Sequence, residues 1–215
     1  MTGGHGPNIV IFDVYEAAFV RRCHDLVMLG YRRLTPASLA SLDETAITGH
    51  LCDAMNAALD ADDRPAWATQ FTPVDDQPES VRGTTGKRRP RTDVCVRCID
   101  PRPERRFRFE AKRLNADQSL RNYLGGDGML ALITGHYGDL PHAGMIGYVQ
   151  IETCSVWSGR IKAAITNDPA TYHAVLPVEF ADLALSGAEA PFCSSHEYGQ
   201  SRARKRITHT LLQCG

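Results

Sequence analysis

The sequence predicts an α/β fold, because stretches with the apolar spacing of a helix alternate with stretches that have the alternation of a strand. Helical spacing is clearest in residues 14–32, 42–60 and 153–167. Strand patterns are clearest in residues 92–114 and in the apolar run 143–151. With 215 residues, of which 43% are hydrophobic, the chain is long enough for one domain, residues 1–215, with a sizeable core.

The first two helices are expected in residues 14–32 and 42–60. Apolar residues of the second recur every four positions, at Ile47, Leu51, Met55 and Leu59. This row predicts a buried helix face. Either Ser41 or Asp43 is expected to cap the helix, because both side chains accept hydrogen bonds from free N–H groups of a first turn. The row then aims Glu44, near the start of the helix, toward the sheet.

A hairpin follows a polar stretch. Residues 61–92 predict a loop with little strand structure, in which Phe71 begins a short strand. Residues 92–100 are rich in β-branched residues and cysteine, which favours a strand. The prolines in residues 101–105 predict a turn, since proline cannot continue a central strand. In residues 107–112, aromatic and apolar residues then alternate with charged ones, which predicts the second strand.

The remaining elements are predicted in the same way. Residues 117–123 suit a helix that a glycine-rich turn ends, and residues 129–134 a short second one. A buried strand is expected over residues 143–151 and a helix over 153–167. The tail predicts two strands, around residues 193–198 and 207–214, which form an antiparallel hairpin at the sheet edge. His196 and His209 would then be cross-strand neighbours, a polar pair rather than a metal site.

The predicted hairpin carries the residues that indicate chemistry. Glu110 and Lys112 are two residues apart, so a strand places both side chains on one face. Asp93, at the start of the first strand, can lie beside them. Carboxylates bind hard cations such as Mg²⁺, and a neighbouring ammonium can orient a water for hydrolysis of a phosphodiester. The alternative is a surface hairpin with a cross-strand salt bridge.

An aspartate, a hairpin and then Glu-x-Lys resemble the PD-(D/E)xK nuclease superfamily, whose core is similar to restriction endonucleases. The first acid of that motif falls on Asp93, the second on Glu110 and the lysine on Lys112; Thr92 stands where many members have proline. The resemblance covers roughly residues 40–152. It implies an α-β-β-β-α-β core with a mixed central sheet between helices. We expect this core to span about residues 40–170, with an N-terminal helix and a C-terminal β-hairpin as additions.

The resemblance also implies further site residues. Glu44, with Asp43 as a competitor, fits the glutamate that many members carry on the preceding helix. Gln150 fits a polar position on the strand after the next helix. Mg²⁺ or Mn²⁺ is expected as cofactor, held by Asp93, Glu110, Glu44 and the backbone carbonyl of Ala111. Lys112 would orient the attacking water, and the product would carry a 5′-phosphate.

Charge is distributed unevenly along the chain. Residues 82–121 hold thirteen basic and five acidic residues, a balance of +8, whereas the whole chain has a net charge of −1. A basic region beside a carboxylate pair indicates a polyanionic partner, with DNA favoured. The alternative is a solvated loop. The candidate nucleic-acid-binding residues are Lys87, Arg88, Arg89, Arg91 and Arg113.

The expected function is therefore a metal-dependent nuclease, in a setting of bacterial antiviral defence. The alternative is a catalytically inactive nucleic-acid-binding or assembly subunit. An ATPase or helicase is a candidate partner, because the chain has no ATP-binding motif of its own, and cutting of duplex would suggest a homodimer. No apolar stretch is long enough for a membrane span, about 18 residues, and no secretory signal is recognisable, so a cytoplasmic protein is expected.

Overall fold

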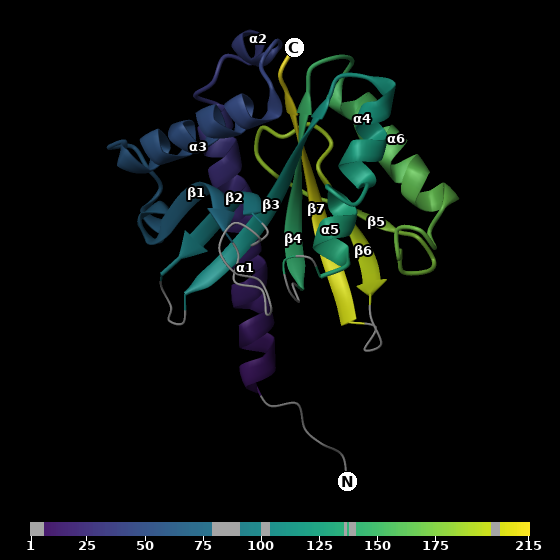
Figure 1. Cartoon of the computed structure of the whole chain (residues 1–215). Coiled ribbons are helices and arrows are strands. Elements are labelled where there is room, and N and C mark those ends of the chain that lie inside the picture. The colour runs from purple at the N-terminus through teal and green to yellow at the C-terminus, as the bar shows by residue number, and fades with distance from the viewer. Residues whose placement is uncertain (1–6, 79–90, 100–103, 136, 138–140, 199–202) are drawn as a thin grey trace.

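The computed structural model describes residues 7–78, 91–99, 104–135, 137, 141–198 and 203–215, and it has an α/β fold (Figure 1). The helices are α1 (Pro7–Tyr31), α2 (Pro36–Leu39), α3 (Glu44–Asp60), α4 (Asp117–Leu124), α5 (Met129–Ile133) and α6 (Cys154–Asn167), with a 3₁₀ turn η1 (Ala66–Gln70). The strands are β1 (Phe71–Pro78), β2 (Arg91–Cys98), β3 (Arg105–Leu114), β4 (His142–Val149), β5 (Phe180–Asp182), β6 (Phe192–Tyr198) and β7 (Ala203–Gln213).

The seven strands of the described residues form one mixed sheet in the order β1-β2-β3-β4-β7-β6-β5. Strands β1 to β3 are antiparallel, β4 is parallel to both β3 and β7, and β6 and β5 continue the sheet antiparallel. Helices α1 and α3 pack on one face, where Phe19 and Leu51 are buried. Helices α4 to α6 pack on the other, where Trp157 is buried. The predicted α/β class, with a mixed sheet between helices, is confirmed.

Local sequence explains where α3 begins. The carboxylate of Asp43 accepts a hydrogen bond from the N–H of Ala46 at 2.8 Å, so Asp43 is the cap rather than Ser41. The predicted apolar row is buried at Ile47, Leu51 and Met55. Glu44 is therefore the first residue of the helix, at the end that lies against β3.

Two parts of the sheet differ from the prediction. Residues 71–78 form a full strand rather than a loop with a short strand, because β1 lies at the sheet edge, where Pro73 and Pro78 are tolerated. The tail hairpin forms, but it is not an edge addition, since β7 lies between β4 and β6. Leu211 faces the α6 side and Leu212 the α1 side, and a strand buried on both faces belongs inside a sheet.

The histidines of the tail belong to a buried chain of hydrogen bonds. The Tyr123 hydroxyl lies 2.9 Å from His209 Nδ1, and His209 Nε2 lies 2.8 Å from Ser194 Oγ. Ser194 Oγ lies 2.7 Å from His196 Nε2, and His196 Nδ1 lies 2.7 Å from the carbonyl of Tyr172. The chain links α4 to β7 and β6. His196 and His209 are thus polar core residues joined through Ser194. They are not cross-strand neighbours as predicted, because the register pairs His196 with Lys205 and His209 with Phe192.

Within the described residues, no helix combines the length and the apolar character that crossing a membrane requires.

Candidate active site

Three elements bring the predicted site residues together. Strand β2 carries Asp93, strand β3 carries Glu110 and Lys112, and helix α3 begins with Glu44. The register of β2 and β3 pairs Val94 with Phe109, so the residues beside this pair, Asp93 and Glu110, are neighbours across the strands. Since Phe109 and Ala111 point into the core under α1, Glu110 and Lys112 point to the opposite face.

The acidic groups surround the ammonium of Lys112. Its Nζ donates hydrogen bonds to Glu44 Oε1 at 3.0 Å, to Glu110 Oε1 at 3.1 Å and to the carbonyl of Ala111 at 2.8 Å. Asp93 Oδ2 lies 3.6 Å from the same nitrogen. The four groups that the sequence suggested as ligands of a cation therefore converge on one point. We call Asp93, Glu110, Glu44 and Lys112 the carboxylate cluster.

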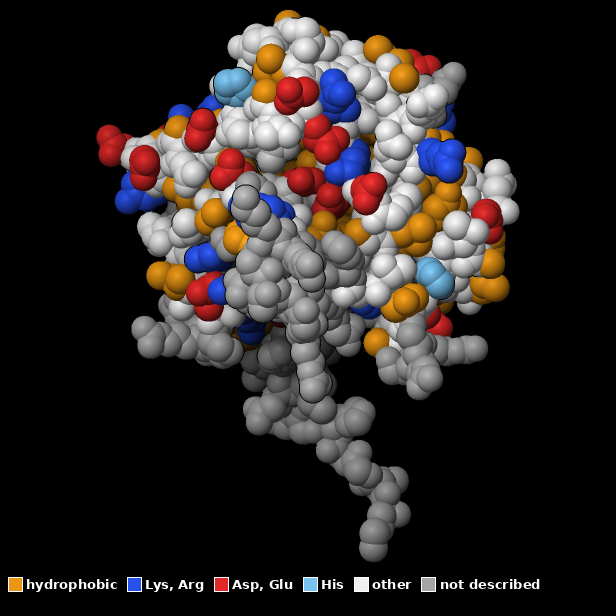
Figure 2. Space-filling model, in the orientation of Figure 1, with side chains coloured by type: hydrophobic (Ala, Val, Ile, Leu, Met, Phe, Trp, Pro, Cys, Tyr) orange, Lys and Arg blue, Asp and Glu red, His pale blue; other side chains and the backbone are white. Residues whose placement is uncertain are grey.

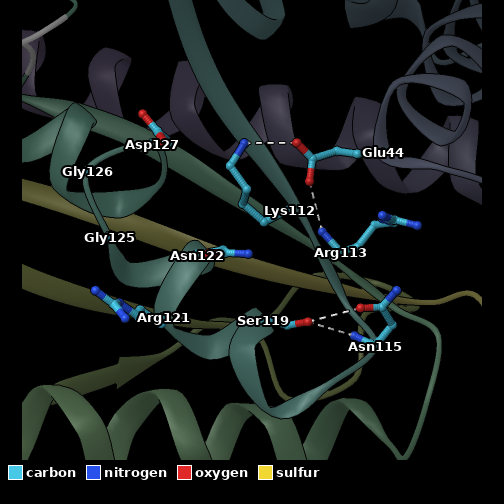
Figure 3. A pocket seen from close by; sticks show the side chains of 10 residues that line it. All are labelled: Glu44, Lys112, Arg113, Asn115, Ser119, Arg121, Asn122, Gly125, Gly126 and Asp127. Carbon is cyan, nitrogen blue, oxygen red and sulfur yellow. Dashed lines mark hydrogen bonds and ion pairs between the residues drawn. The ribbon is translucent and has the colours of Figure 1, made fainter.

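Each carboxylate of the cluster is also held by a second donor. The N–H of Ala111 donates to Asp93 Oδ2 at 2.7 Å. The N–H of Arg113 donates to Glu44 Oε2 at 3.1 Å, a bond that Figure 3 shows. The Tyr137 hydroxyl donates to Glu110 Oε2 at 2.7 Å. These bonds fix the direction of each acid independently of Lys112. Two of the donors are backbone groups of β3 itself, so the strand orients the acids that face it.

Burial and charge shift the titration of the cluster. Burial, followed by the nearby charge of Asp93, raises the pKa of Glu110 to about 8, against the opposing effect of Lys112 and Tyr137. For Lys112, burial acts to lower the pKa, but Asp93, Glu110 and Glu44 together outweigh it, and the pKa is raised. Lys112 is therefore a permanent cation. It can orient a water or stabilise negative charge, but it does not accept a proton at neutral pH.

The donor set fits a hard divalent cation, since it consists of three carboxylates and a carbonyl. Their present arrangement is built around an ammonium, however. Among the residues that the structure describes, no group of three or more His, Cys, Asp and Glu side chains is arranged so that it could hold a metal ion. A cation would therefore have to displace Lys112 Nζ from between the acids.

Gln150 lies apart from the cluster and has a structural role. Its Nε2 donates to the carbonyls of Leu39 at 3.0 Å and Leu42 at 2.8 Å, and its Oε1 accepts from Asn115 Nδ2 at 3.2 Å. The amide is thus fully used in holding the segment that leads into α3. The structure places Gln150 as a clamp on the residues before Glu44, and it shows no contact between Gln150 and the carboxylate cluster.

A cavity of about 550 Å³ opens beside the cluster (Figure 3). Besides Glu44 and Lys112 it is lined by polar and glycine residues of β3, of the segment between β3 and α4, of α4 and of the turn that follows α4: Arg113, Asn115, Ser119, Arg121, Asn122, Gly125, Gly126 and Asp127. Within the described part of the chain, neither Arg113 nor Arg121 forms an ion pair through its guanidinium. The cavity thus offers two basic groups next to the carboxylate cluster.

The structure describes two of the five candidate nucleic-acid-binding residues. Lys87, Arg88 and Arg89 lie outside the described residues. Arg91 begins β2, and its carbonyl oxygen lies 3.3 Å from the Tyr137 hydroxyl. Arg113 lines the cavity.

Arginines around the β2–β3 turn are partly neutralised. Arg106 and Arg97 lie 2.8 and 3.8 Å from Glu104, and Arg105 lies 3.5 Å from Glu16. Figure 2 likewise shows acidic and basic side chains next to one another on this face. Glu104 is already counted in the balance of residues 82–121, so Glu16 is the acid that the fold adds to this basic region.

The structure adds two residues that the sequence did not indicate. Tyr137 follows α5 in a short loop, and Asp127 lies in the glycine-rich turn after α4. Asp127 contributes, after Glu110 and Asp93, to a raised pKa of the Tyr137 hydroxyl, for which burial is the largest cause. No sequence signal marks either residue, because only the packing of α4 and α5 brings Tyr137 to Glu110 and Asp127 to the wall of the cavity.

No protein-family model, no curated protein and no solved structure matches this chain.

Proposed function

We propose that the protein is a metal-dependent nuclease that hydrolyses phosphodiester bonds, with DNA as the favoured substrate. The observation that carries the proposal is the convergence of Asp93, Glu110, Glu44 and the Ala111 carbonyl on Lys112 Nζ. A partly buried set of three acids and a lysine, in which Glu110 is buried, is costly to maintain for stability alone. Perturbed titration in such a set, next to a cavity, is typical of functional sites.

The resemblance to the PD-(D/E)xK superfamily supports the proposal. The elements run α3, β1, β2, β3, α4, α5 and β4, in which a helix, three strands, a helical segment and a strand follow one another. This is the order that a restriction-endonuclease-like core requires. The two motif strands are adjacent and antiparallel, and both motif acids and the lysine lie on one face.

The chain's own residues would divide the work as follows. Asp93, Glu110, Glu44 and the Ala111 carbonyl would hold Mg²⁺ or Mn²⁺, which supplies a polarised water and charge for the phosphate. Lys112, turned away from the acids, remains charged and can orient the attacking water or stabilise the charge that develops on the phosphate. Arg113 and Arg121 line the cavity and can bind backbone phosphates beside the scissile one.

The substrate and metal requirement can be tested in one assay. Supercoiled plasmid, linear duplex, single-stranded DNA and RNA are each incubated with Mg²⁺, Mn²⁺ or EDTA. We expect cleavage of at least one DNA substrate with either metal and none in EDTA, because the acids cannot act on a phosphate without a cation. Cleavage that continues in EDTA, or no cleavage of any substrate, would contradict the proposal.

The same assay examines a second candidate, a nucleic-acid-binding or assembly subunit without catalysis. The position of the ammonium between the acids, with no group arranged to hold a metal among the described residues, favours this alternative. Binding of DNA that is equally tight in EDTA and in Mg²⁺, without turnover, would support it. Bacterial defence, an ATPase or helicase partner and a homodimer remain parts of the proposal that copurification and sedimentation can test.

Gln150→Leu is expected to slow cleavage by roughly tenfold or more, because the clamp on Leu39 and Leu42 positions Glu44 and a small misplacement is costly. The free energy of unfolding should also fall by about 2 kcal/mol, since two carbonyls lose their donors. Gln213→Leu is the matched control. Gln213 also donates to carbonyls at the end of a parallel strand, at Glu152 and Gly215, but to neither Leu39 nor Leu42. The Gln213→Leu variant should be less stable than the wild-type protein but cleave at the same rate. Equal cleavage rates in Gln150→Leu and Gln213→Leu would contradict the role of Gln150 in positioning Glu44.

A further inference from the structure

A second cavity, of about 600 Å³, lies on the opposite face of the sheet from the carboxylate cluster. Thr208 of β7 lines it and shares its strand face with Leu212, which packs in the core under α1. Lys112 shares its face with Leu114, which packs in the core under α6. The two cavities therefore do not communicate across the sheet. The second one lies between α1, strands β6 and β7, and residues 183–185.

The lining of this cavity combines an apolar wall with a basic rim. The wall includes Val20, Leu183 and Leu185, and the rim includes Arg21, Arg204 and Arg206. Glu16 also lines the cavity, but it is paired with Arg105 at 3.5 Å. This composition and a volume of several hundred cubic ångströms are typical of small-molecule sites.

The arginines of the rim differ in their partners. Arg21 lies 3.9 Å from Asp25, and Arg204 lies 3.6 Å from Glu197. For Arg206, no ion pair is found within the described residues, although its side chain is exposed beside His142. Arg206 is therefore the basic group of the rim that a ligand can engage without breaking an existing pair.

His24 gives an independent indication of a ligand. The side chain is 1% exposed and lines the cavity, with Nδ1 bonded to Thr210 Oγ1 at 3.0 Å. Its other nitrogen, Nε2, is buried and has no hydrogen-bond partner in the described structure. Burial lowers the pKa of His24 to about 3, so the ring is neutral. An unpaired buried polar atom is costly, and each such atom in a native protein calls for an explanation.

We propose that this cavity binds a small organic anion with an apolar body. Arg206 binds the acidic group, the wall of Val20, Leu183 and Leu185 covers the body, and His24 provides a polar contact at the inner wall. The ligand class follows from the charge of the rim and the apolar character of the wall. It does not depend on the nuclease proposal, because no residue of the carboxylate cluster takes part.

Fluorescence of 1-anilinonaphthalene-8-sulfonate, an aromatic anion, measures the site directly. Octanoate, which has both an acid and an apolar body, should displace the dye at a concentration at least about tenfold lower than 1-octanol or acetate, which each lack one part. Hexyl phosphate and octanoate are compared to distinguish a phosphorylated from a carboxylated ligand. Equal displacement by octanoate and octanol would overturn the proposal, because the rim would then contribute nothing.

Two exposed alanines of α1 provide a matched pair of variants. Ala17 lines the cavity, whereas its neighbour Ala18 does not. Ala17→Trp should fill the cavity and weaken dye binding at least about tenfold, while Ala18→Trp should bind the dye as the unsubstituted protein does.

Arg206→Gln should weaken dye binding about ten- to hundredfold, since a hydrogen bond to a charged group is lost. Circular dichroism verifies the fold of each variant. Unchanged binding by Ala17→Trp or by Arg206→Gln would overturn the assignment.

Discussion

Lys112→Met is expected to reduce metal-dependent cleavage by about a thousandfold and, in EDTA, to lower the free energy of unfolding by about 2 to 3 kcal/mol. The ammonium binds Glu44 and Glu110 and lies 3.6 Å from Asp93. Without it, three carboxylates repel one another in a partly buried space. The cost stays below that of a fully buried pair for two reasons: Asp93 and Glu44 are about a third exposed, and Glu110 can take up a proton.

Mg²⁺ should restore much of this lost stability, because a divalent cation can take over the neutralisation of the three acids. The measurement is urea denaturation of the wild-type and variant proteins in EDTA and in Mg²⁺. The variant should gain more from Mg²⁺ than the wild-type protein, in which the ion must first displace the ammonium. A smaller gain in the variant than in the wild-type protein would contradict the idea that cation and ammonium compete for one place.

Two other substitutions separate catalysis from stability. Asp93→Ala should abolish cleavage in the same way, yet destabilise less, because it removes one of the mutually repelling charges. Arg33→Met is the control for the loss of an ordinary ion pair, since Arg33 lies 3.8 Å from an Asp63 that is 90% exposed. It should change neither cleavage nor stability appreciably. Full cleavage by Lys112→Met or Asp93→Ala would remove the assignment of these residues.

Acidification from pH 6 to pH 5 in EDTA is expected to lower the free energy of unfolding by about 2 to 3 kcal/mol. The reason is a set of buried neutral histidines. Burial lowers the pKa of His24 to about 3 and of His196 to about 4, and it lowers the pKa of His209 well below the ordinary value. In the unfolded chain the same rings bind protons near pH 6.5.

The direction follows from proton counts in the two states. Below pH 6.5 the unfolded state holds up to three more protons on these histidines, so their contribution to stability is present above that pH and is lost as the pH falls. Glu110 acts in the opposite direction. Its pKa is raised to about 8 in the folded state, so below pH 8 the folded state holds one more proton there. The net difference is about two protons, each worth about 1.4 kcal/mol per pH unit.

Hydrogen bonding explains why the histidines must stay neutral. The carbonyl of Tyr172 only accepts, so His196 Nδ1 carries a hydrogen and the neutral ring accepts from Ser194 at Nε2. Ser194 Oγ then accepts from His209 Nε2, and His209 Nδ1 accepts from Tyr123. Every proton in the chain is thereby assigned. A second proton on His196 Nε2 would face the hydroxyl hydrogen of Ser194. A second proton on His209 Nδ1 would face the hydroxyl hydrogen of Tyr123.

Chemical denaturation at a series of pH values measures this slope. His209→Gln removes one titrating ring and should reduce the slope by about 1 kcal/mol per pH unit. His50→Gln, at an exposed position of α3, should leave it unchanged. A slope in His209→Gln equal to that of the wild-type protein would show that His209 is protonated in the folded state, contrary to the buried chain described above.

The sequence was sufficient to predict which charged side chains of β3 lie together. In β3 the alternation of Phe107 and Phe109 with charged residues determines which side chains enter the core, and the period of two then places Glu110 and Lys112 together. The apolar row of α3 likewise predicts that Glu44 approaches the sheet. These are local patterns, in which a few residues determine the orientation of their neighbours.

Features that depend on long-range packing were not predictable in this way. Tyr137 reaches Glu110 only because the short helix α5 returns the chain to β3, and Gln150 meets the segment before α3 across the end of β4. The place of β7 inside the sheet depends on which strand it pairs with, since an apolar strand fits an interior position beside any parallel neighbour. Strand order is a property of the whole fold.

Crystals grown with Mn²⁺ test the central claim most directly, because the anomalous scattering of manganese identifies the ion. The account predicts a manganese peak between the carboxylates of Asp93, Glu110 and Glu44, with the ammonium of Lys112 moved out from among them. Absence of a peak there, with Lys112 still bonded to Glu44 and Glu110, would contradict it.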